Sequence, residues 1–192
     1  MRKAKAVRET AEVKISVKLD LDGKGRSKIE TGNRFLNHML TTISKHSLID
    51  LEVNATGDLK HHLSEDVALT IGEALSKALG DKRGIKRFGT AHVPMDESLA
   101  RAAMDLGGRP HIELDLKIQS SQIEDLVTED IEHFFISLGQ SSKSNLHLTT
   151  LYGNNDHHKI EAVVKALALA LKEAVSLDSR ISKSIPSTKG EL

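Results

Sequence analysis

The stretch HHLSEDVALTIGEALSKALG, residues 61–80, has a second version in HHKIEAVVKALALALKEAVS, residues 157–176. Each stretch opens with two adjacent histidines and has a glutamate four residues after the first of them, and the two copies are 96 residues apart. Apolar residues recur at helical spacing in both, which predicts two long helices. Later positions agree at the same offset: Ala74 with Ala170, Leu75 with Leu171, and Ala78 with Ala174. A repeat on this scale indicates an internal duplication.

The segments around the first copy predict further elements. Residues 11–25, AEVKISVKLDLDGKG, alternate apolar and polar side chains and end in an Asp-Gly turn, as a strand does. Residues 33–46, NRFLNHMLTTISKH, have the spacing of a helix with Asn33 as its N-cap. Residues 48–56, LIDLEVNAT, alternate again and predict a strand. The long helix then closes at Gly80.

The second half repeats this order. Residues 100–118, ARAAMDLGGRPHIELDLKI, predict two strands around a Gly-Gly-Arg-Pro turn. Residues 128–140, TEDIEHFFISLGQ, predict a helix capped by Thr128, and residues 145–153, NLHLTTLYG, predict a strand. We therefore expect an α+β fold of two β-β-α-β-α halves, residues 1–92 and 93–192, whose sheets pack on helix pairs in one compact unit.

Composition excludes several classes of protein. The formal net charge is zero, so nothing suggests an electrostatic surface for nucleic acid or an anionic membrane. The chain has no cysteine, which excludes disulfides and thiolate metal sites. The basic N-terminal residues lack the apolar core of a signal peptide, and lysines interrupt the most apolar stretch. We expect a cytoplasmic protein without nucleic-acid or membrane partners.

The duplicated histidines predict metal binding. On a helix, residues i and i+4 share a face, so His61 with Glu65, and His157 with Glu161, can bind one ion each. The second histidine of each pair, His62 or His158, points about 100° away and is available to a different ion. His38 and His133, on the preceding helices, occupy equivalent places and can complete the sites. Imidazole and carboxylate ligands without sulfur suit Mn, Fe, Co, Ni or Zn.

A single His-His pair is usually a surface or capping feature, and a duplication copies such features as well. Here the sequence around the pairs has diverged while the histidines and glutamates are retained, which favours the metal interpretation. Arg87, Arg109 and Lys189, the last beside Ser187, suit a phosphate or carboxylate. Taken singly, the two arginines read as surface charges and the lysine as part of a frayed tail.

Seven segments together resemble the imidazoleglycerol-phosphate dehydratase family of histidine biosynthesis: RFLNHML (34–40), GDLKHHLSED (57–66), ALGDKRGIKRFGTAHVPMDESL (78–99), DLGGRP (105–110), EHFFISL (132–138), LYGNNDHHKIEAVVKALALAL (151–171) and PSTKG (186–190). The resemblance extends in order from about Glu9 to Leu192. It implies a hydro-lyase with the duplicated fold known as ribosomal protein S5 domain 2-like. It also implies two Mn²⁺ ions per active site, with other divalent transition metals as alternatives, and a cytoplasmic homo-oligomer, a shell of twenty-four subunits built from trimers that share active sites.

The resemblance assigns roles to thirteen residues. The implied metal ligands are His38, His61, His62, Glu65, His133, His157, His158 and Glu161. The implied contacts to the phosphate substrate are Glu9, Arg87, Arg109, Ser187 and Lys189, which replaces the frayed-tail interpretation of Lys189. The chain departs from the family pattern at Asn37, where many members have aspartate, and in a shorter loop before His61 that ends in Lys60 instead of two aspartates. Such carboxylates orient ligating histidines and raise their basicity, so the departures put the orientation of the histidines and the metal preference in question, but not the ligand set.

The substrate chemistry suggests a route for the dehydration of imidazole glycerol phosphate to imidazole acetol phosphate. The carbon that loses its proton bears a hydroxyl group and no carbonyl, so direct abstraction is unfavourable. A metal on the imidazole ring gives access to the imidazolate, which can expel the hydroxyl and acidify the neighbouring C–H. Glu9 is our candidate for proton transfer, with Glu161 or a metal-bound water as alternatives.

Two other functions fit the same residues. A metal-dependent phosphoesterase could use the same ions for in-line displacement and would release inorganic phosphate. A structural metal protein could use the ions to join subunits without turning over a small molecule.

Overall fold

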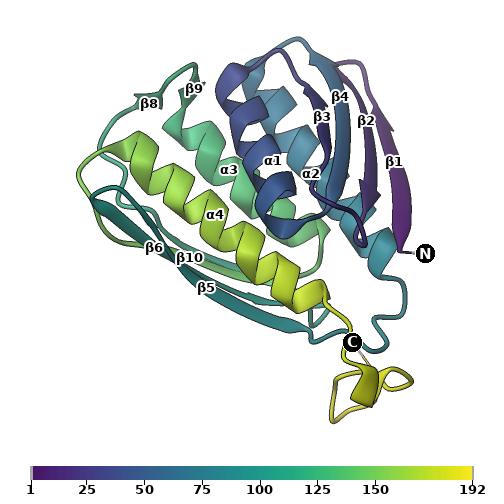
Figure 1. The fold of residues 1–192 in the computed structure, drawn as a ribbon. Helices are drawn as coiled ribbons and strands as arrows, with labels where there is room; N and C mark the ends of the chain where they lie inside the picture. Colours follow the sequence, from purple (N-terminus) through teal and green to yellow (C-terminus); the bar gives the residue numbers. More distant parts are fainter. Residues whose placement is uncertain (1, 192) are drawn as a thin grey trace.

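The computed structural model describes residues 2–191 and contains two four-stranded sheets with four helices between them (Figure 1). The first sheet has the strand order β1-β2-β4-β3 and the second has the order β5-β6-β10-β7. The bounds of the first sheet are β1 Lys3–Glu9, β2 Val13–Asp20, β3 Ser27–Glu30 and β4 Asp50–Gly57. Those of the second are β5 Phe88–Met95, β6 Ser98–Asp105, β7 His111–Asp115 and β10 Asn145–Tyr152.

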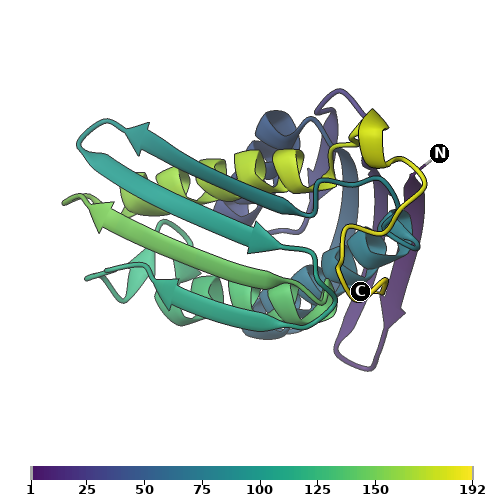
Figure 2. The same cartoon turned by 90° about the horizontal axis from the view of Figure 1, so that it is seen from below.

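The helices form the inner layer and bury their apolar faces against the sheets and against one another. They are α1 Arg34–Ser47, α2 Lys60–Leu79, α3 Thr128–Ser141 and α4 Asp156–Val175. α1 packs on α4 and α2 on α3, so each helix contacts a helix of the other half. α2 also packs on β1 and β2, while α4 packs on β5 and β6, as Figure 2 shows for the second sheet. One hydrophobic core therefore runs through both halves.

The α+β duplication is confirmed, with one strand more in each half than the sequence suggested. β1 and β5 stand at corresponding edges of the two sheets, and each pairs antiparallel with the next strand. The segment KAKAVRE of β1 carries small alanines on its buried side, and β5 contains glycine and proline, so neither shows a strong apolar alternation. The expected division after residue 92 falls inside β5, because that strand belongs wholly to the second sheet.

One local prediction was wrong, and two others are confirmed. Thr128 does not cap α3, because the N-cap residue is Val127 and the Thr128 hydroxyl donates instead to the carbonyl oxygen of Ser120. β6 and β7 flank the Gly-Gly-Arg-Pro turn as predicted, and β10 lies between them in the sheet. Asn33 does cap α1, and its side chain accepts from the Leu36 amide at 2.8 Å.

The remaining elements are short. The hairpin of β8 (Gln122–Ile123) and β9 (Leu126–Val127) precedes α3, and a 3₁₀ turn, Ser179–Ile181, follows α4. Within residues 2–191, none of the helices combines the length and the apolar character that crossing a bilayer requires.

Candidate metal centres

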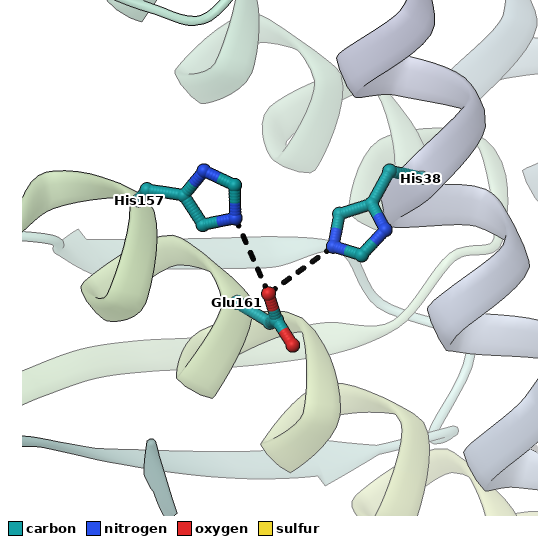
Figure 3. Close-up of side chains that lie close together, drawn as sticks. All are labelled: His38, His157 and Glu161. Atoms are coloured by element: carbon teal, nitrogen blue, oxygen red, sulfur yellow. Dashed lines mark hydrogen bonds and ion pairs between the residues drawn. The ribbon is translucent and has the colours of Figure 1, made fainter. Parts of the chain in front are cut away.

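Histidine and glutamate side chains gather in two places among the described residues. In the first cluster, His38 of α1 meets His157 and Glu161 of α4 (Figure 3). The Nε2 atoms of the two histidines lie 3.2 and 3.3 Å from the same oxygen, Glu161 Oε2. Glu161 is largely covered by its neighbours, with a side-chain exposure of 13%. The two imidazoles therefore converge on one buried carboxylate oxygen.

The second cluster is the counterpart of the first in the other pair of helices. His61 and Glu65 of α2 meet His133 of α3, and one ligand atom from each lies within 4.8 Å of the others. His61 Nε2 is 4.0 Å from Glu65 Oε2, and the rings of His61 and His133 meet edge to face with centroids 5.2 Å apart. This cluster is more open than the first, since both His61 and Glu65 are about two-fifths exposed.

Each cluster combines residues from both halves of the chain. The i, i+4 pair comes from the long helix of one half, and the third histidine comes from the shorter helix of the other half. The reason is the packing of α1 on α4 and of α2 on α3. The sequence identified the six side chains but could not show this exchange of partners.

Every histidine of the two His-His pairs has a carboxylate at its Nδ1 atom. His61 contacts Asp130 at 2.7 Å and His62 contacts Asp58 at 3.0 Å, while His157 contacts Glu124 at 3.0 Å and His158 contacts Glu97 at 2.7 Å. A carboxylate at Nδ1 favours the tautomer whose proton is on Nδ1, which leaves the Nε2 lone pair available to a metal. Sequence reasoning missed all four carboxylates, although Asp58 lies four residues before His62 on the chain.

The geometry of the first cluster suits a divalent ion. With the His157 proton on Nδ1, its Nε2 lone pair faces a Glu161 oxygen, an arrangement that a bound cation relieves. Two ligand atoms about 2.1 Å from one ion lie roughly 3.0–3.4 Å apart, which agrees with the observed spacings. Burial raises the pKa of Glu161, but hydrogen bonds from Lys165 and His38 outweigh it and lower the pKa to about 2. The Glu161 carboxyl is therefore ionised at neutral pH.

His62 and His158 lie outside both clusters, as the 100° step along the helix predicts. Both rings sit near the molecular surface, with side-chain exposures of 30% and 28%. The hydrogen bond with Asp58 raises the pKa of His62, and the hydrogen bond with Glu97 raises the pKa of His158. Their carboxylate partners thus orient them and increase their basicity as ligands.

The two departures from the family pattern have structural explanations. The Asn37 side-chain oxygen accepts from the amide and the hydroxyl of Thr31, at 3.1 and 2.7 Å, and so holds the turn before α1. The Lys60 ammonium donates to the carbonyl oxygen of Asp125 at 3.0 Å. For the first His-His pair, the orienting carboxylates in this chain are those of Asp58 and Asp130.

The predicted phosphate-binding side chains gather at one cavity of about 400 Å³, lined by Arg87, Gly107, Gly108, Arg109, Ser187, Thr188, Lys189 and Glu191. Arg87 donates two hydrogen bonds to the Asp105 carboxylate, at 2.6 and 2.9 Å, and a third to the carbonyl oxygen of Pro186. It therefore attaches the C-terminal segment to β6. Glu9 is not part of this lining; it lies at the end of β1 with its carboxylate 3.3 Å from the Lys14 ammonium.

This cavity and the metal clusters lie at opposite ends of the long helices. His157 is in the first turn of α4, whereas the backbone amide of Arg87 donates to Ala174, in the last turn of the same helix. At 1.5 Å per residue, these two points of the helix are about 25 Å apart. The C-terminal segment follows that last turn, whereas β8 and β9 lie near the opposite, N-terminal end of α4 (Figure 1).

Comparison with known proteins gives consistent similarities. A family model described as imidazoleglycerol-phosphate dehydratase matches residues 31–171. Proteins of that name from Chloroherpeton thalassium and Methanothermobacter thermautotrophicus are each 50% identical, covering 98% and 100% of this chain and 97% and 98% of theirs. The crystal structure of the Staphylococcus aureus enzyme superimposes with a TM-score of 0.85 at 34% identity, covering 92% of this chain and 99% of that one. The Pyrococcus furiosus enzyme, in complex with (S)-C348, also gives 0.85, at 33% identity, with coverages of 97% and 99%.

Proposed function

The chain belongs to the imidazoleglycerol-phosphate dehydratase family and is a hydro-lyase of histidine biosynthesis, and we propose that it uses Mn²⁺ held by its two His-His-Glu clusters. The observation that carries the proposal is the convergence of His38 Nε2 and His157 Nε2 on Glu161 Oε2. The donor set of imidazole and carboxylate without thiolate suits Mn²⁺, with other divalent transition metals as alternatives. Six of the eight implied ligands thus lie in the two clusters, and the other two, His62 and His158, lie outside them.

The chemistry follows from the groups present. The residues of the two clusters would hold a divalent ion, which would supply Lewis acidity to the imidazole ring of the substrate and so favour loss of the hydroxyl group. The cations of Arg109 and Lys189, with the Ser187 hydroxyl, bind the phosphate and fix the position of the carbon chain. Arg87 supports them by holding the C-terminal segment through Pro186 and keeps further N–H donors for the phosphate.

Proton transfer is assigned to an acidic residue near the reacting carbon. The Glu161 carboxylate contacts His38 and His157 and pairs with Lys165, so a role as metal ligand is favoured over a role as general base. Glu9 is exposed on the outer strand β1, and we propose that it reaches the substrate in an active site formed with another subunit. A metal-bound water is the alternative base.

The separation of the two ends of the helix supports a shared active site. A phosphate ester about ten bonds long extends roughly 10 Å at bond lengths near 1.5 Å, which is far less than the length of α4. One chain therefore cannot present its own metal clusters and its own phosphate cavity to one substrate molecule. We propose a homo-oligomer in which they come from different subunits, with His62 and His158 directed to neighbouring chains. The twenty-four-subunit shell of trimers is our proposal for the complete assembly.

The direct test is turnover of the natural substrate. Mn²⁺-loaded protein is incubated with imidazole glycerol phosphate, and the enolisable ketone product is followed alongside inorganic phosphate. We expect ketone formation that a chelator abolishes. Release of inorganic phosphate without ketone would favour a phosphoesterase, and metal-dependent assembly without any turnover would favour a structural role.

Replacing Arg109 tests the phosphate cavity. Losing one contact to a charged group costs roughly 1.5–3 kcal/mol, so Arg109→Ala should lower kcat/KM by about tenfold to a few hundredfold. Metal content should stay unchanged, because Arg109 is not among the candidate metal ligands. Arg26→Ala, in the exposed loop between β2 and β3, is the matched control. Wild-type kinetics in folded, metal-replete Arg109→Ala protein would remove this residue from the site.

A further inference from the structure

The segment between β7 and α3 breaks the symmetry of the two halves. It spans residues 116–127, whereas the corresponding link between β3 and α1 spans residues 31–33. The longer segment contains the β8–β9 hairpin, whose turn is formed by Glu124 and Asp125. The strand order and helix order of the halves otherwise agree, so this segment gives one half contacts that have no equivalent in the short link of the other.

Asp125 binds the starts of two helices that carry ligand residues. Its carboxylate oxygens accept from the amides of Arg34 and Phe35, at 2.8 and 2.9 Å, which are the first two N–H groups of α1. Its carbonyl oxygen accepts from the Asn33 side chain and from the Lys60 ammonium, both at 3.0 Å. These contacts fix α1 about one turn before His38, and they tie α1 to the first residue of α2.

Glu124 adds a contact to a third helix. Its Oε1 lies 3.0 Å from Nδ1 of His157, at the start of α4. His157 and His38 are the two imidazoles that converge on Glu161, so the neighbouring residues Glu124 and Asp125 each control the position of one of them. The Glu124 side chain is 60% exposed, which means that its replacement puts little packing at risk.

The segment itself has a buried anchor. The Asp156 carboxylate accepts from the backbone amides of Gln119 and Ser120, at 3.0 and 2.7 Å. It also pairs at 2.8 Å with Lys159, which is 1% exposed and donates to the carbonyl oxygen of Lys117. Because this ammonium is buried and donates to both Asp156 and the main chain of Lys117, it joins the 116–127 segment to the first turn of α4. The hairpin is thus presented to the first cluster from a rigid base.

The second cluster is supported differently. His61 Nδ1 contacts Asp130, a carboxylate on α3 itself whose side chain is 5% exposed. That contact comes from the packing of α2 on α3 and does not require the hairpin. Among residues 2–191, the hairpin is hydrogen-bonded to α2 only through the main-chain carbonyl oxygen of Asp125, whereas the side chains of Asp125 and Glu124 bind α1 and α4, the two helices of the first centre.

We propose that the Glu124 and Asp125 side chains are positioning groups for the His38–His157–Glu161 centre alone, so that these two carboxylates control one of the two metal centres independently of the other. The inference rests on the proposed function, because it takes both clusters to be metal centres. Glu124 fixes the tautomer and orientation of His157, and Asp125 fixes the helix that presents His38. Removing a carboxylate that orients a ligating histidine typically weakens metal binding by about 10–100-fold.

The test resolves the two centres with background variants. Glu65→Gln removes a ligand of the second cluster and leaves the first intact, whereas Glu161→Gln removes a ligand of the first cluster and leaves the second intact. Glu124→Ala is introduced into each of these two variants. Bound Mn²⁺ per chain is measured by equilibrium dialysis of the assembled protein over a range of free Mn²⁺. In the Glu65→Gln background, Glu124→Ala should weaken the remaining ion about 10–100-fold, whereas in the Glu161→Gln background it should have no effect. Asp125→Ala should follow the same pattern, and Glu124→Gln should lose less, because its amide oxygen still accepts from Nδ1.

The control is Glu129→Ala, an exposed residue at the start of α3, which should change neither ion. Equal weakening in both backgrounds, or unchanged binding in the Glu65→Gln background, would overturn the assignment. Failure of the unmodified protein to bind Mn²⁺ at all would instead refute the proposed metal centres.

Discussion

Glu161→Gln is expected to lower kcat by about 10³-fold and to remove one of the two Mn²⁺ ions per chain. Glu161 Oε2 is the atom on which the Nε2 atoms of His38 and His157 converge. A neutral amide oxygen is a weaker ligand, and the amide nitrogen has no lone pair to offer. Metal-derived charge stabilisation is worth several kcal/mol, and each 1.36 kcal/mol corresponds to a factor of ten in rate.

The measurement combines steady-state kinetics with metal analysis on the purified assembly. Glu132→Gln, exposed on α3, is the matched control and should retain both ions and full activity. An unchanged thermal midpoint for metal-free Glu161→Gln protein would show that the loss arises at the site and not from misfolding. Full metal content together with undiminished turnover in this variant would exclude Glu161 as a ligand.

The second large effect is expected on assembly. Replacing both His62 and His158 by alanine should reduce the oligomer to smaller units, even though neither residue belongs to a cluster within its own chain. Each imidazole is oriented by a carboxylate at Nδ1, which leaves its Nε2 atom available to the ion that, in our proposal, a neighbouring chain completes. A chelator at pH 7 should produce the same reduction in the wild-type protein, because the ions would then be part of the subunit interface.

Light scattering together with metal analysis decides the outcome. Adding Mn²⁺ back should restore the mass and activity of chelator-treated wild-type protein, but not those of the double variant. His46→Ala, exposed in the last turn of α1, should assemble normally. If chelator-treated protein kept its full mass, the ions would not bridge subunits.

Local sequence patterns predicted the helices and the six cluster residues well. The i, i+4 spacing of His61 and Glu65 needs only helical geometry, and the duplication indicated the corresponding pair at His157. β1 and β5 were missed because alanine, glycine and proline replace the large apolar residues that define a strand pattern. The exchange of His38 and His133 between halves was out of reach, since it depends on how helices from different halves pack.

The carboxylates that orient the histidines also could not be predicted, because most of them are distant from the histidines in the sequence. Asp130 lies 69 residues from His61 along the chain, and Glu97 lies 61 residues from His158. Acidic side chains are common in loops, and only the folded chain shows which of them reach an imidazole. At the C-terminus, position along the chain favoured a frayed tail, whereas the contacts of Arg87 and Arg83 with main-chain carbonyls of Pro186 and Lys183 attach the segment.

The distance between the metal clusters and the phosphate cavity predicts that two defective variants can complement each other when both are expressed in one cell. If each active site takes these two parts from different chains, a variant damaged in one part and a variant damaged in the other are not equivalent when mixed. Co-expressed Glu161→Gln and Arg109→Ala chains would pair an intact metal end with an intact phosphate end in about a quarter of the sites of a randomly mixed oligomer. Two impaired alleles would thus complement each other within one protein, and a cell carrying both would grow better without histidine than a cell carrying either one.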